Sequence, residues 1–559
     1  MAVPRSRDIV LSRRRIETLI AAGRKIVIVD GSVLKVDAWI PYHPGGDKAI
    51  LHMVGRDATN EIKAFHSLET QDVMKRYCIG RINGIWKDFV PPIQGGKFAE
   101  EEQREGVREL SEDNSSGASS PEPSPIFERA EYHTTARRRR TSDSAGSESS
   151  ATSFETLAVE ETTKPKRTLT AGDRKTQEEL ERDLSIFPSL DADTQNTIVN
   201  KYKLLDQRLR AEGLYNCNYR AYAIEAVRYL TLGALSFCFL RSGWYALSAV
   251  FLGMLWHQLV FTVHDAGHMG ITHNFQIDSC IGIFIANFLG GLSCCWWKRN
   301  HNVHHIVTNS AEHDPDIQHM PFFAISHRFL SSLYSTYYDR PMPLDRFAQK
   351  ALQYQHYLYY PILAFGRFNL YVLSWQHIFL GEGSRKGPSW WHRYLEMAGQ
   401  AFFWFWFGYL VVYRSIPTAG ARIMFVLISH ATTMPVHLQI TLSHFAMSTV
   451  DLGVAESFPQ RMLRTTMDVD CPAWLDFIHG GLQFQAVHHL FPRMPRHNLR
   501  QAQPLVKEFC EEVEIPYAIY GFGEGNGKVI SRLEEVAQQV RVLAECAGSM
   551  GVADAVGAH

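Results

Sequence analysis

The distribution of hydrophobic and polar positions divides the 559-residue chain into a mixed front part, a polar middle and an apolar body. In the front part, residues 26–36 read IVIVDGSVLKV, and two β-rich runs around Asp-Gly predict a β-hairpin. Residues 95–175 are rich in Ser, Glu, Pro and Arg with almost no apolar periodicity, which predicts a disordered linker. A polar helical pattern follows over about residues 175–215.

The apolar body predicts two pairs of membrane-spanning helices, because a span needs roughly 20 apolar residues. The predicted spans are residues 222–240, 244–263, 397–413 and 419–442. Residues 279–297 are shorter and interrupted by Gly, which indicates a re-entrant or interfacial segment. Residues 351–380 are rich in Tyr and Phe and suit a helix on the membrane surface.

Charge, cysteine content and the amino terminus restrict the class of partner and the cellular compartment. The formal net charge of −1 argues against nucleic acid as a partner, and the nine Cys lack a CxxC pair, so we expect reduced thiols. The first 30 residues hold no apolar signal-peptide core, so the amino terminus is expected in the cytosol. Four crossings then return the chain to the cytosol, which places four distant histidine groups on one membrane face.

These groups are the candidate site. Spacings of i, i+4 and i, i+3, i+4 put the first two groups on single helix faces. The candidate metal ligands are His264, His268, His301, His304, His305, His444, His488 and His489, with Gln485 one turn before the last pair. Eight imidazoles exceed what one ion needs, so we expect two metals, and because the chain shows no Cys or HExxH pattern of zinc ligands we expect iron rather than zinc. Asp265, Asp314 and Asp316 are candidates to orient the ligands.

The motifs HxxxH, HxxHH and QxxHH, in this order around two membrane hairpins, resemble the front-end desaturase family over about residues 220–510. The resemblance implies a centre of two non-haem irons that activates O₂ and removes two hydrogens from a methylene pair. The seven histidines of the three motifs, His264, His268, His301, His304, His305, His488 and His489, then form the catalytic set. Other histidines, including His257, His273, His319, His356, His377 and His437, are expected to be structural.

The front part suggests where electrons come from. YHPGGDKAI at residues 42–50, followed by AFHS at residues 64–67, resembles cytochrome b5. The resemblance implies one haem b held by His43 and His66, a pair that leaves no open position for O₂. It also implies NADH-cytochrome b5 reductase as the electron donor.

The lipid substrate is indicated by two further stretches. WWKRNHNVHHIVTN (residues 296–309) and EHDPDIQHMPFFAI (residues 312–325) resemble fungal sphingolipid 8-desaturases most. They imply a ceramide or other sphingolipid substrate that gains a double bond at C8 of its long-chain base. A front-end polyunsaturated fatty acyl 5- or 6-desaturase is the alternative, and a b5-fused lipid hydroxylase is a more distant one.

The expected architecture is a small α+β haem domain of cytochrome b5 type plus an all-α membrane domain with four transmembrane helices and a cytosolic histidine-rich cap. The expected divisions are a haem domain at 8–92, a linker at 95–175, a desaturase-like membrane domain at 176–510 and a cytosolic tail at 511–559. The resemblance implies a multi-pass protein of the endoplasmic reticulum membrane, with haem domain and active site facing the cytosol.

Overall fold

The computed structural model describes residues 9–98 and 170–556. Its amino-terminal domain contains α1 (Arg13–Ala21), β1 (Ile26–Val29), β2 (Ser32–Lys35), α2 (Lys48–Leu51), α3 (Thr59–Phe65), α4 (Leu68–Met74) and β3 (Cys78–Arg81). The predicted hairpin is confirmed, since β1 and β2 pair antiparallel and β3 joins the other edge of β2. Asp30 and Gly31 form its turn with φ of 46° and 71°, the positive values that a tight hairpin turn favours.

Most of the predicted linker lies outside the described residues. The chain continues in α6 (Ala171–Ile186) and α7 (Ala192–Ala211), so the predicted polar helices are confirmed. Thr170 and Asp173 form a reciprocal capping box at the start of α6, and the Asp191 carboxylate accepts from two backbone N–H groups at the start of α7.

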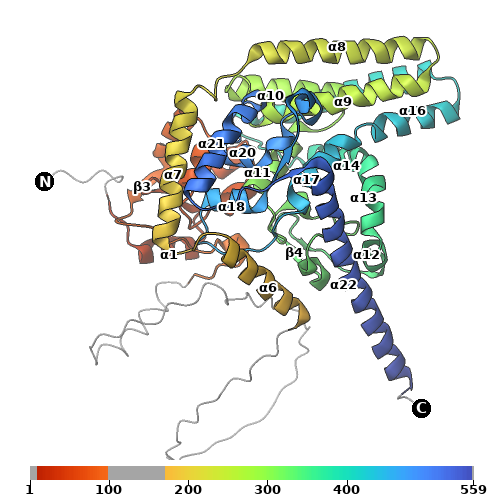
Figure 1. Ribbon diagram of the computed structural model, residues 1–559. Coiled ribbons are helices and arrows are strands. Elements are labelled where there is room, and N and C mark those ends of the chain that lie inside the picture. The colour runs from red at the N-terminus through yellow and green to blue at the C-terminus, as the bar shows by residue number, and fades with distance from the viewer. Residues whose placement is uncertain (1–8, 99–169, 557–559) are drawn as a thin grey trace, which may run out of the picture.

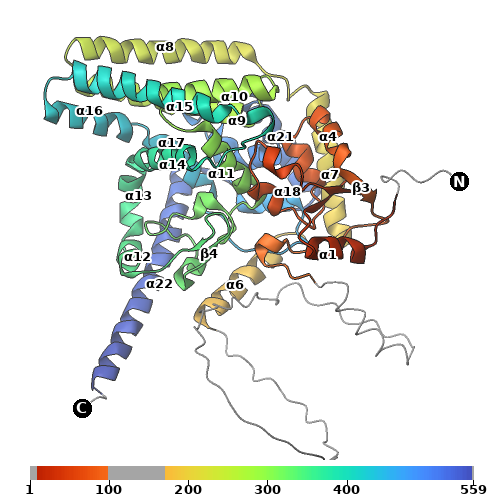
Figure 2. The same cartoon turned by 180° about the vertical axis from the view of Figure 1, so that it is seen from behind.

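Four helices of the described chain are long and apolar enough to cross a membrane, as predicted. They are α8 (Tyr219–Arg241), α9 (Tyr245–Gly267), Gly387–Ser415, which includes α15 (His392–Phe403) and the π-helix η9 (Trp404–Ser415), and Ala419–Phe445, formed by α16 (Ala419–Ala431) and α17 (Met434–Phe445). In Figures 1 and 2, α8, α9, α15 and α16 run side by side. The third helix begins well before the predicted residue 397, because its first turns carry polar residues such as Glu396 that are buried in the protein.

The predicted re-entrant segment bends sharply. It consists of α10 (Phe275–Ile283), the π-helix η5 (Phe284–Leu289) and α11 (Cys294–Ile306), and the helix axis bends by 118° between the first arm and the second. Gly291 sits at the bend with φ of 69°, where an added Cβ would lie 2.4 Å from the Phe403 ring. Only glycine fits such a position without displacing α15.

The aromatic stretch before the third span is broken into three helices rather than one. These are α12 (Arg346–Leu352), α13 (Gln355–Ala364) and α14 (Gly366–Leu380). Tyr357 and Phe379 are each 69% exposed, which suits contact with lipid at the membrane surface. Arg367 of α14 is buried instead, with its guanidinium 4.3 Å from the centre of the Trp256 ring.

The carboxy-terminal part packs against the membrane helices. It contains α18 (Phe458–Thr465), β6 (Asp468–Asp470), α19 (Asp476–His479), α20 (Gln485–Leu490), α21 (Leu499–Glu512), β7 (Ile519–Gly521) and α22 (Phe522–Val556). The parallel pairing of β6 with β7, together with the packing of α22 on α12, α13 and α17, ties residues beyond 511 to the same body. The division at 511 stays a prediction.

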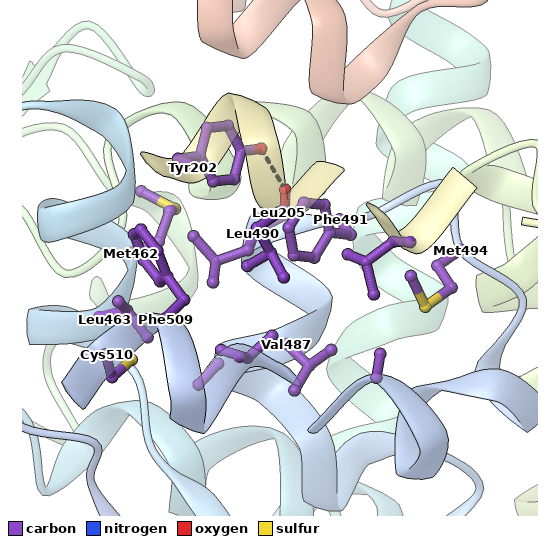
Figure 3. Packing of buried hydrophobic residues seen from close by; sticks show 14 of the residues in the cluster. Tyr202, Leu205, Met462, Leu463, Val487, Leu490, Phe491, Met494, Phe509 and Cys510 are labelled. Atoms are coloured by element: carbon purple, nitrogen blue, oxygen red, sulfur yellow. Dashed lines mark hydrogen bonds between the residues drawn. The ribbon is translucent and has the colours of Figure 1, made fainter. Parts of the chain in front are cut away.

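A hydrophobic core between α7, α18, α20 and α21 fixes the position of α20 (Figure 3). Tyr202 of α7 stacks on Phe491, with ring centres 5.4 Å apart, and its hydroxyl donates to the Leu490 carbonyl at 2.8 Å. Both partners follow directly after His488 and His489. The core therefore holds the last histidine pair in place.

Candidate functional site

The structure brings the predicted histidines together into two adjoining groups. One contains His264, His268, His301 and His488, and the other contains His304, His444 and His489. Within each group the candidate ligand atoms lie within 4.8 Å of one another. Ligands on opposite sides of one ion stand about 4.2 Å apart when each metal–nitrogen bond is about 2.1 Å, so each group has the size for one ion.

His305 lies between the two groups. Its ring centre is 4.9 Å from that of His268 in the first group and 4.1 Å from that of His489 in the second. Gln485 lies one turn before His488 on α20, and its Oε1 is buried without a hydrogen-bond partner in the described chain.

The unpaired nitrogens fit metal binding. The following buried atoms have no hydrogen-bond partner among the described residues: His264 Nε2, His268 Nε2, His305 Nδ1, His444 Nδ1, His488 Nε2 and His489 Nε2. Buried polar atoms are normally satisfied, so six unpaired imidazole nitrogens on the residues of the two groups and on His305 require an explanation, which bound metal ions would provide. Burial, and then neighbouring imidazoles, lower the pKa of His488 and His489 well below the usual range, which favours the neutral form that binds metals.

Two of the three candidate orienting carboxylates contact the histidines. Asp314 accepts from His304 Nδ1 at 2.8 Å and from the backbone N–H of Asn309 at 2.7 Å, so it fixes the ring and leaves His304 Nε2 as ligand. Asp316 lies 3.4 Å from His301 Nδ1. Asp265 differs from the expectation: it pairs with Arg496 and accepts from the Tyr222 hydroxyl, and thereby joins α8, α9 and the segment before α21.

Sequence patterns did not single out several supporting residues. Asn309, with a φ of 59°, donates its side-chain amide to the His444 carbonyl at 2.8 Å and so links the second histidine group to the end of α17. Asp468 accepts from the Ala486 N–H at 2.8 Å and anchors the start of α20. Trp297 stacks on His301 with ring centres 4.6 Å apart. Trp297 and Asn309 lie in the stretch 296–309 quoted above, but single polar or aromatic residues carry no spacing signal that marks such a supporting role.

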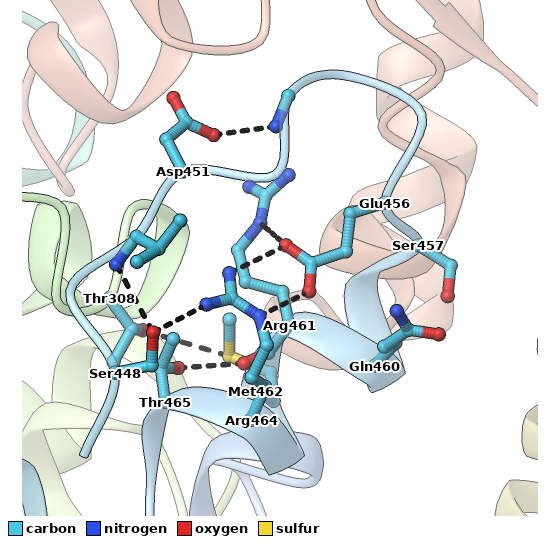
Figure 4. Close-up of polar contacts among 12 residues, drawn as sticks. Thr308, Ser448, Asp451, Glu456, Ser457, Gln460, Arg461, Met462, Arg464 and Thr465 are labelled. Atoms are coloured by element: carbon cyan, nitrogen blue, oxygen red, sulfur yellow. Dashed lines mark hydrogen bonds and ion pairs between the residues drawn. The ribbon is translucent and has the colours of Figure 1, made fainter. Parts of the chain in front are cut away.

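A buried ionic network holds the loop that follows His444 (Figure 4). Arg464 makes a bidentate pair with Glu456 at 2.7 and 2.9 Å and donates to the Ser448 hydroxyl at 3.0 Å. It also donates to Asp183 of α6 at 2.9 Å. Because Asn309 contacts the Ser448 carbonyl at 3.2 Å, this network and the second histidine group share one loop.

His43 and His66 face each other across a cavity of about 540 Å³ in the amino-terminal domain. Their ring centres are 6.1 Å apart, which leaves room for one iron between them. Nδ1 of His43 hydrogen-bonds the Gly46 carbonyl at 2.6 Å and Nδ1 of His66 the Ile62 carbonyl at 3.1 Å, so each Nε2 is left for a ligand. Burial lowers the pKa of His66 to about 3, so it is neutral. The apolar cavity between two neutral imidazoles fits a haem.

The haem-sized cavity and the histidine groups share a wall. His268 and Asn302 of the membrane body line the cavity together with Phe65 and His66. Phe65 also contacts His305 edge to face, with ring centres 5.5 Å apart.

Polar contacts hold the two domains in this arrangement. Asp47 pairs with Arg299 at 3.0 Å, and Lys48 donates to the Thr336 carbonyl at 3.0 Å.

The histidines expected to be structural stay outside these groups. The described chain contains no group of three candidate ligand atoms that includes His257, His273, His319, His356, His377 or His437. His273 bridges the carbonyls of Met269 and Tyr215 at 2.7 and 2.8 Å. His257 is buried on α9 two turns before His264, with its Nε2 unpaired.

Comparison with known proteins supports the resemblances seen in the motifs. Residues 242–521 match the family Fatty acid desaturase, and residues 14–83 match the family Cytochrome b5-like Heme/Steroid binding domain. The chain is 61% identical to a Delta 8-(E)-sphingolipid desaturase of Emericella nidulans, over 97% of each chain. It is 50% identical to one of Kluyveromyces lactis, over 97% of this chain and 95% of the relative. It is 47% identical to one of Candida albicans, over 96% of this chain and 97% of the relative.

Proposed function

The chain belongs to the fatty acid desaturase family and carries a cytochrome b5-like domain, and from this premise we propose that it forms the trans double bond at C8 of the long-chain base of ceramides. It is an integral membrane oxidoreductase. The observation that carries the choice of lipid is the 61% identity, over 97% of both chains, to a relative named for this reaction.

Two non-haem irons are the proposed occupants of the histidine groups. His264, His268, His301 and His488 would hold one, and His304, His444 and His489 the other, with His305 and Gln485 completing the set. Iron held there would activate O₂, so that O₂, two electrons, two protons and the two hydrogens taken from the lipid together become two waters.

The chain's own residues would prepare this site. Asp314 holds His304 in one tautomer and one orientation, which strengthens it as a ligand. His268 and His488 are buried, His264 and His301 are partly buried, and Trp297 packs against His264, His268 and His301, so the first group is shielded from much of the solvent.

The haem domain would supply the electrons one at a time. His43 and His66 would hold a single haem b, and a haem held by two histidines suits electron transfer rather than O₂ binding. NADH-cytochrome b5 reductase is the proposed donor. Phe65, next to His66, lines the haem pocket and contacts His305, so it connects the haem pocket with the histidine groups.

The proposed location is the endoplasmic reticulum membrane, with the haem domain and the histidine groups on the cytosolic side. Both sites lie at the same end of the membrane helices, which supports a common side for electron delivery and chemistry (Figures 1 and 2).

Expression in a yeast without sphingolipid 8-desaturation tests the proposal. Mass spectrometry of the lipids should reveal a trans 8-unsaturated long-chain base, absent from cells expressing His304→Ala. New 5- or 6-unsaturated acyl chains would refute the choice of lipid, and a product that has gained oxygen would identify a hydroxylase.

A further inference from the structure

Lys298 of α11 carries a buried ammonium group that lacks a polar partner. Its Nζ atom is buried and has no hydrogen-bond partner among the described residues. The atom lies 5.2 Å from the centre of the Phe275 ring, and this cation–π contact leaves its three N–H donors unused. Burying a charge without a hydrogen-bonding partner is costly, so this group indicates a ligand that comes from outside the chain.

The same side chain lines the haem-sized cavity that holds His43 and His66. Among the described residues that line this cavity, Lys298 is the only lysine or arginine, whereas the haem domain contributes two acids, Glu61 and Glu69. Burial and the positive charge of Lys298 both lower the pKa of His43, so this charge acts on a histidine of the cavity. The basic side chain of the cavity therefore belongs to the membrane body and not to the haem domain.

Two glycines of the haem domain let α11 come close to the cavity. A Cβ on Gly45 would lie 2.7 Å from Asn302 Nδ2, and a Cβ on Gly46, whose φ is 84°, would lie 2.8 Å from Arg299 Cγ. Lys298 and Asn302 are spaced i, i+4 on α11 and both line the cavity, so one face of this helix forms part of its wall. A larger residue at either glycine would push that wall away.

The unused ammonium group matches the chemistry of a haem. Haem b carries two propionate side chains that end in carboxylates, and an ammonium group offers such an oxygen both hydrogen-bond donors and the opposite charge. Glu61 and Glu69 would repel the same groups. Building on the haem proposed above, we propose that Lys298 of the membrane body binds a haem propionate, so that the second domain completes the haem site.

This assignment couples haem binding to the docking of the two domains. A propionate bound by Lys298 is available only when the haem domain lies against α11, so haem binding and docking strengthen each other by the same factor. Lys298 precedes His301 by three residues on α11. The bound propionate would therefore hold the haem against the helix that carries the second histidine motif.

Haem release from the full-length, iron-loaded protein in lipid nanodiscs tests the proposal. The rate is measured at constant neutral pH from the absorbance change as haem passes to an excess of apomyoglobin. Lys298→Met keeps an unbranched side chain but removes the charge, and it should release haem at least about 10-fold faster, the effect of losing one hydrogen bond to a charged group. Lys298→Arg keeps the charge and should stay close to the wild-type rate.

Haem dimethyl ester, in which both propionates are blocked, provides the chemical control. The wild type and Lys298→Met should release this ester at the same rate, because it offers no carboxylate to the ammonium group. The matched variant is Lys48→Met, which removes a lysine that contacts the Thr336 carbonyl across the same domain interface but does not line the cavity. It should release haem at close to the wild-type rate.

Non-haem iron content identifies variants that have not folded, and Lys298→Gln then replaces the methionine variant with the same expected direction. A wild-type release rate in a folded, uncharged Lys298 variant would overturn the proposal. Equal acceleration for haem and for its dimethyl ester would also overturn it, because Lys298 would then act by packing alone. A full-length protein that takes up no haem would instead overturn the haem site on which the proposal rests.

Discussion

The ring of Phe65 meets the imidazole of His305 edge to face, with ring centres 5.5 Å apart, and so joins the haem pocket to the histidine groups. Phe65 is the residue before His66, and His305 lies between the two groups. The contact would give electrons a short path through packed side chains between a haem and metals bound at these sites.

Phe65→Ala should slow this electron transfer severalfold, because it opens a gap in the path. Stopped-flow absorbance would measure the rate at which reduced haem is reoxidised by the iron-loaded protein in the presence of O₂ and lipid. Phe65→Tyr, which keeps the ring, serves as the control and should stay close to the wild-type rate. A wild-type rate in Phe65→Ala would show that electrons take another path.

His304→Ala should lower the iron content by at least one ion per chain and abolish the product, while the haem absorbance persists. His304 belongs to the second group and is oriented by Asp314. The comparison is His257→Ala, which removes another buried imidazole that carries an unpaired nitrogen but lies outside the groups. Elemental analysis should find normal iron in the His257 variant, and equal iron loss in both would argue against the assigned ligands.

Asp314→Asn should weaken iron binding by roughly 10- to 100-fold, the usual effect of losing a carboxylate behind a histidine ligand. The measurement is iron retention against increasing chelator. Asp470→Asn, at an exposed position at the end of β6, should retain iron like the wild type. Unchanged retention in the Asp314 variant would mean that packing alone orients His304.

Asp47→Asn should weaken docking of the haem domain only modestly. The Asp47–Arg299 pair is partly exposed, and such pairs contribute about 0–1 kcal/mol. Haem reoxidation should slow by at most about fivefold, and the difference from wild type should shrink at high salt because salt screens the pair. Asp72→Asn, which breaks an exposed pair within the haem domain, should have no effect.

Lowering the pH should release the haem, because acid protonates the histidines that would hold it. The pKa of His66 is lowered to about 3 in the folded chain, whereas an unfolded histidine titrates near 6.5, so unfolding takes up a proton between these values. The stability of the haem domain should therefore fall as the pH drops from about 6.5 toward 3. Haem absorbance followed during acid titration should show this loss, and a pH-independent band across that window would contradict the assignment.

Sequence patterns predicted those features of the fold and the site that produce a regular local pattern along the chain. Helical spacing placed His264 with His268, and His301 with His304 and His305, on single faces, and hydropathy located four apolar helices. Both signals are local patterns, which can be recognised in the sequence without knowledge of the fold.

Features that depend on tertiary contact escaped prediction. The start of α15 was missed because residues before Met397, such as Glu396, look like solvent-facing residues until the fold buries them. Asp265 seemed suited to orient a ligand, but the approach of Arg496 gives it a different partner. The contact of Phe65 with His305 joins residues 240 positions apart, and no local pattern encodes it.

His268 lines the haem-sized cavity and is also a member of the first histidine group. A metal ion bound on one side of this imidazole would place its charge next to a haem bound on the other. The absorbance and midpoint potential of that haem would then report, in intact membranes, whether the neighbouring site holds its metal.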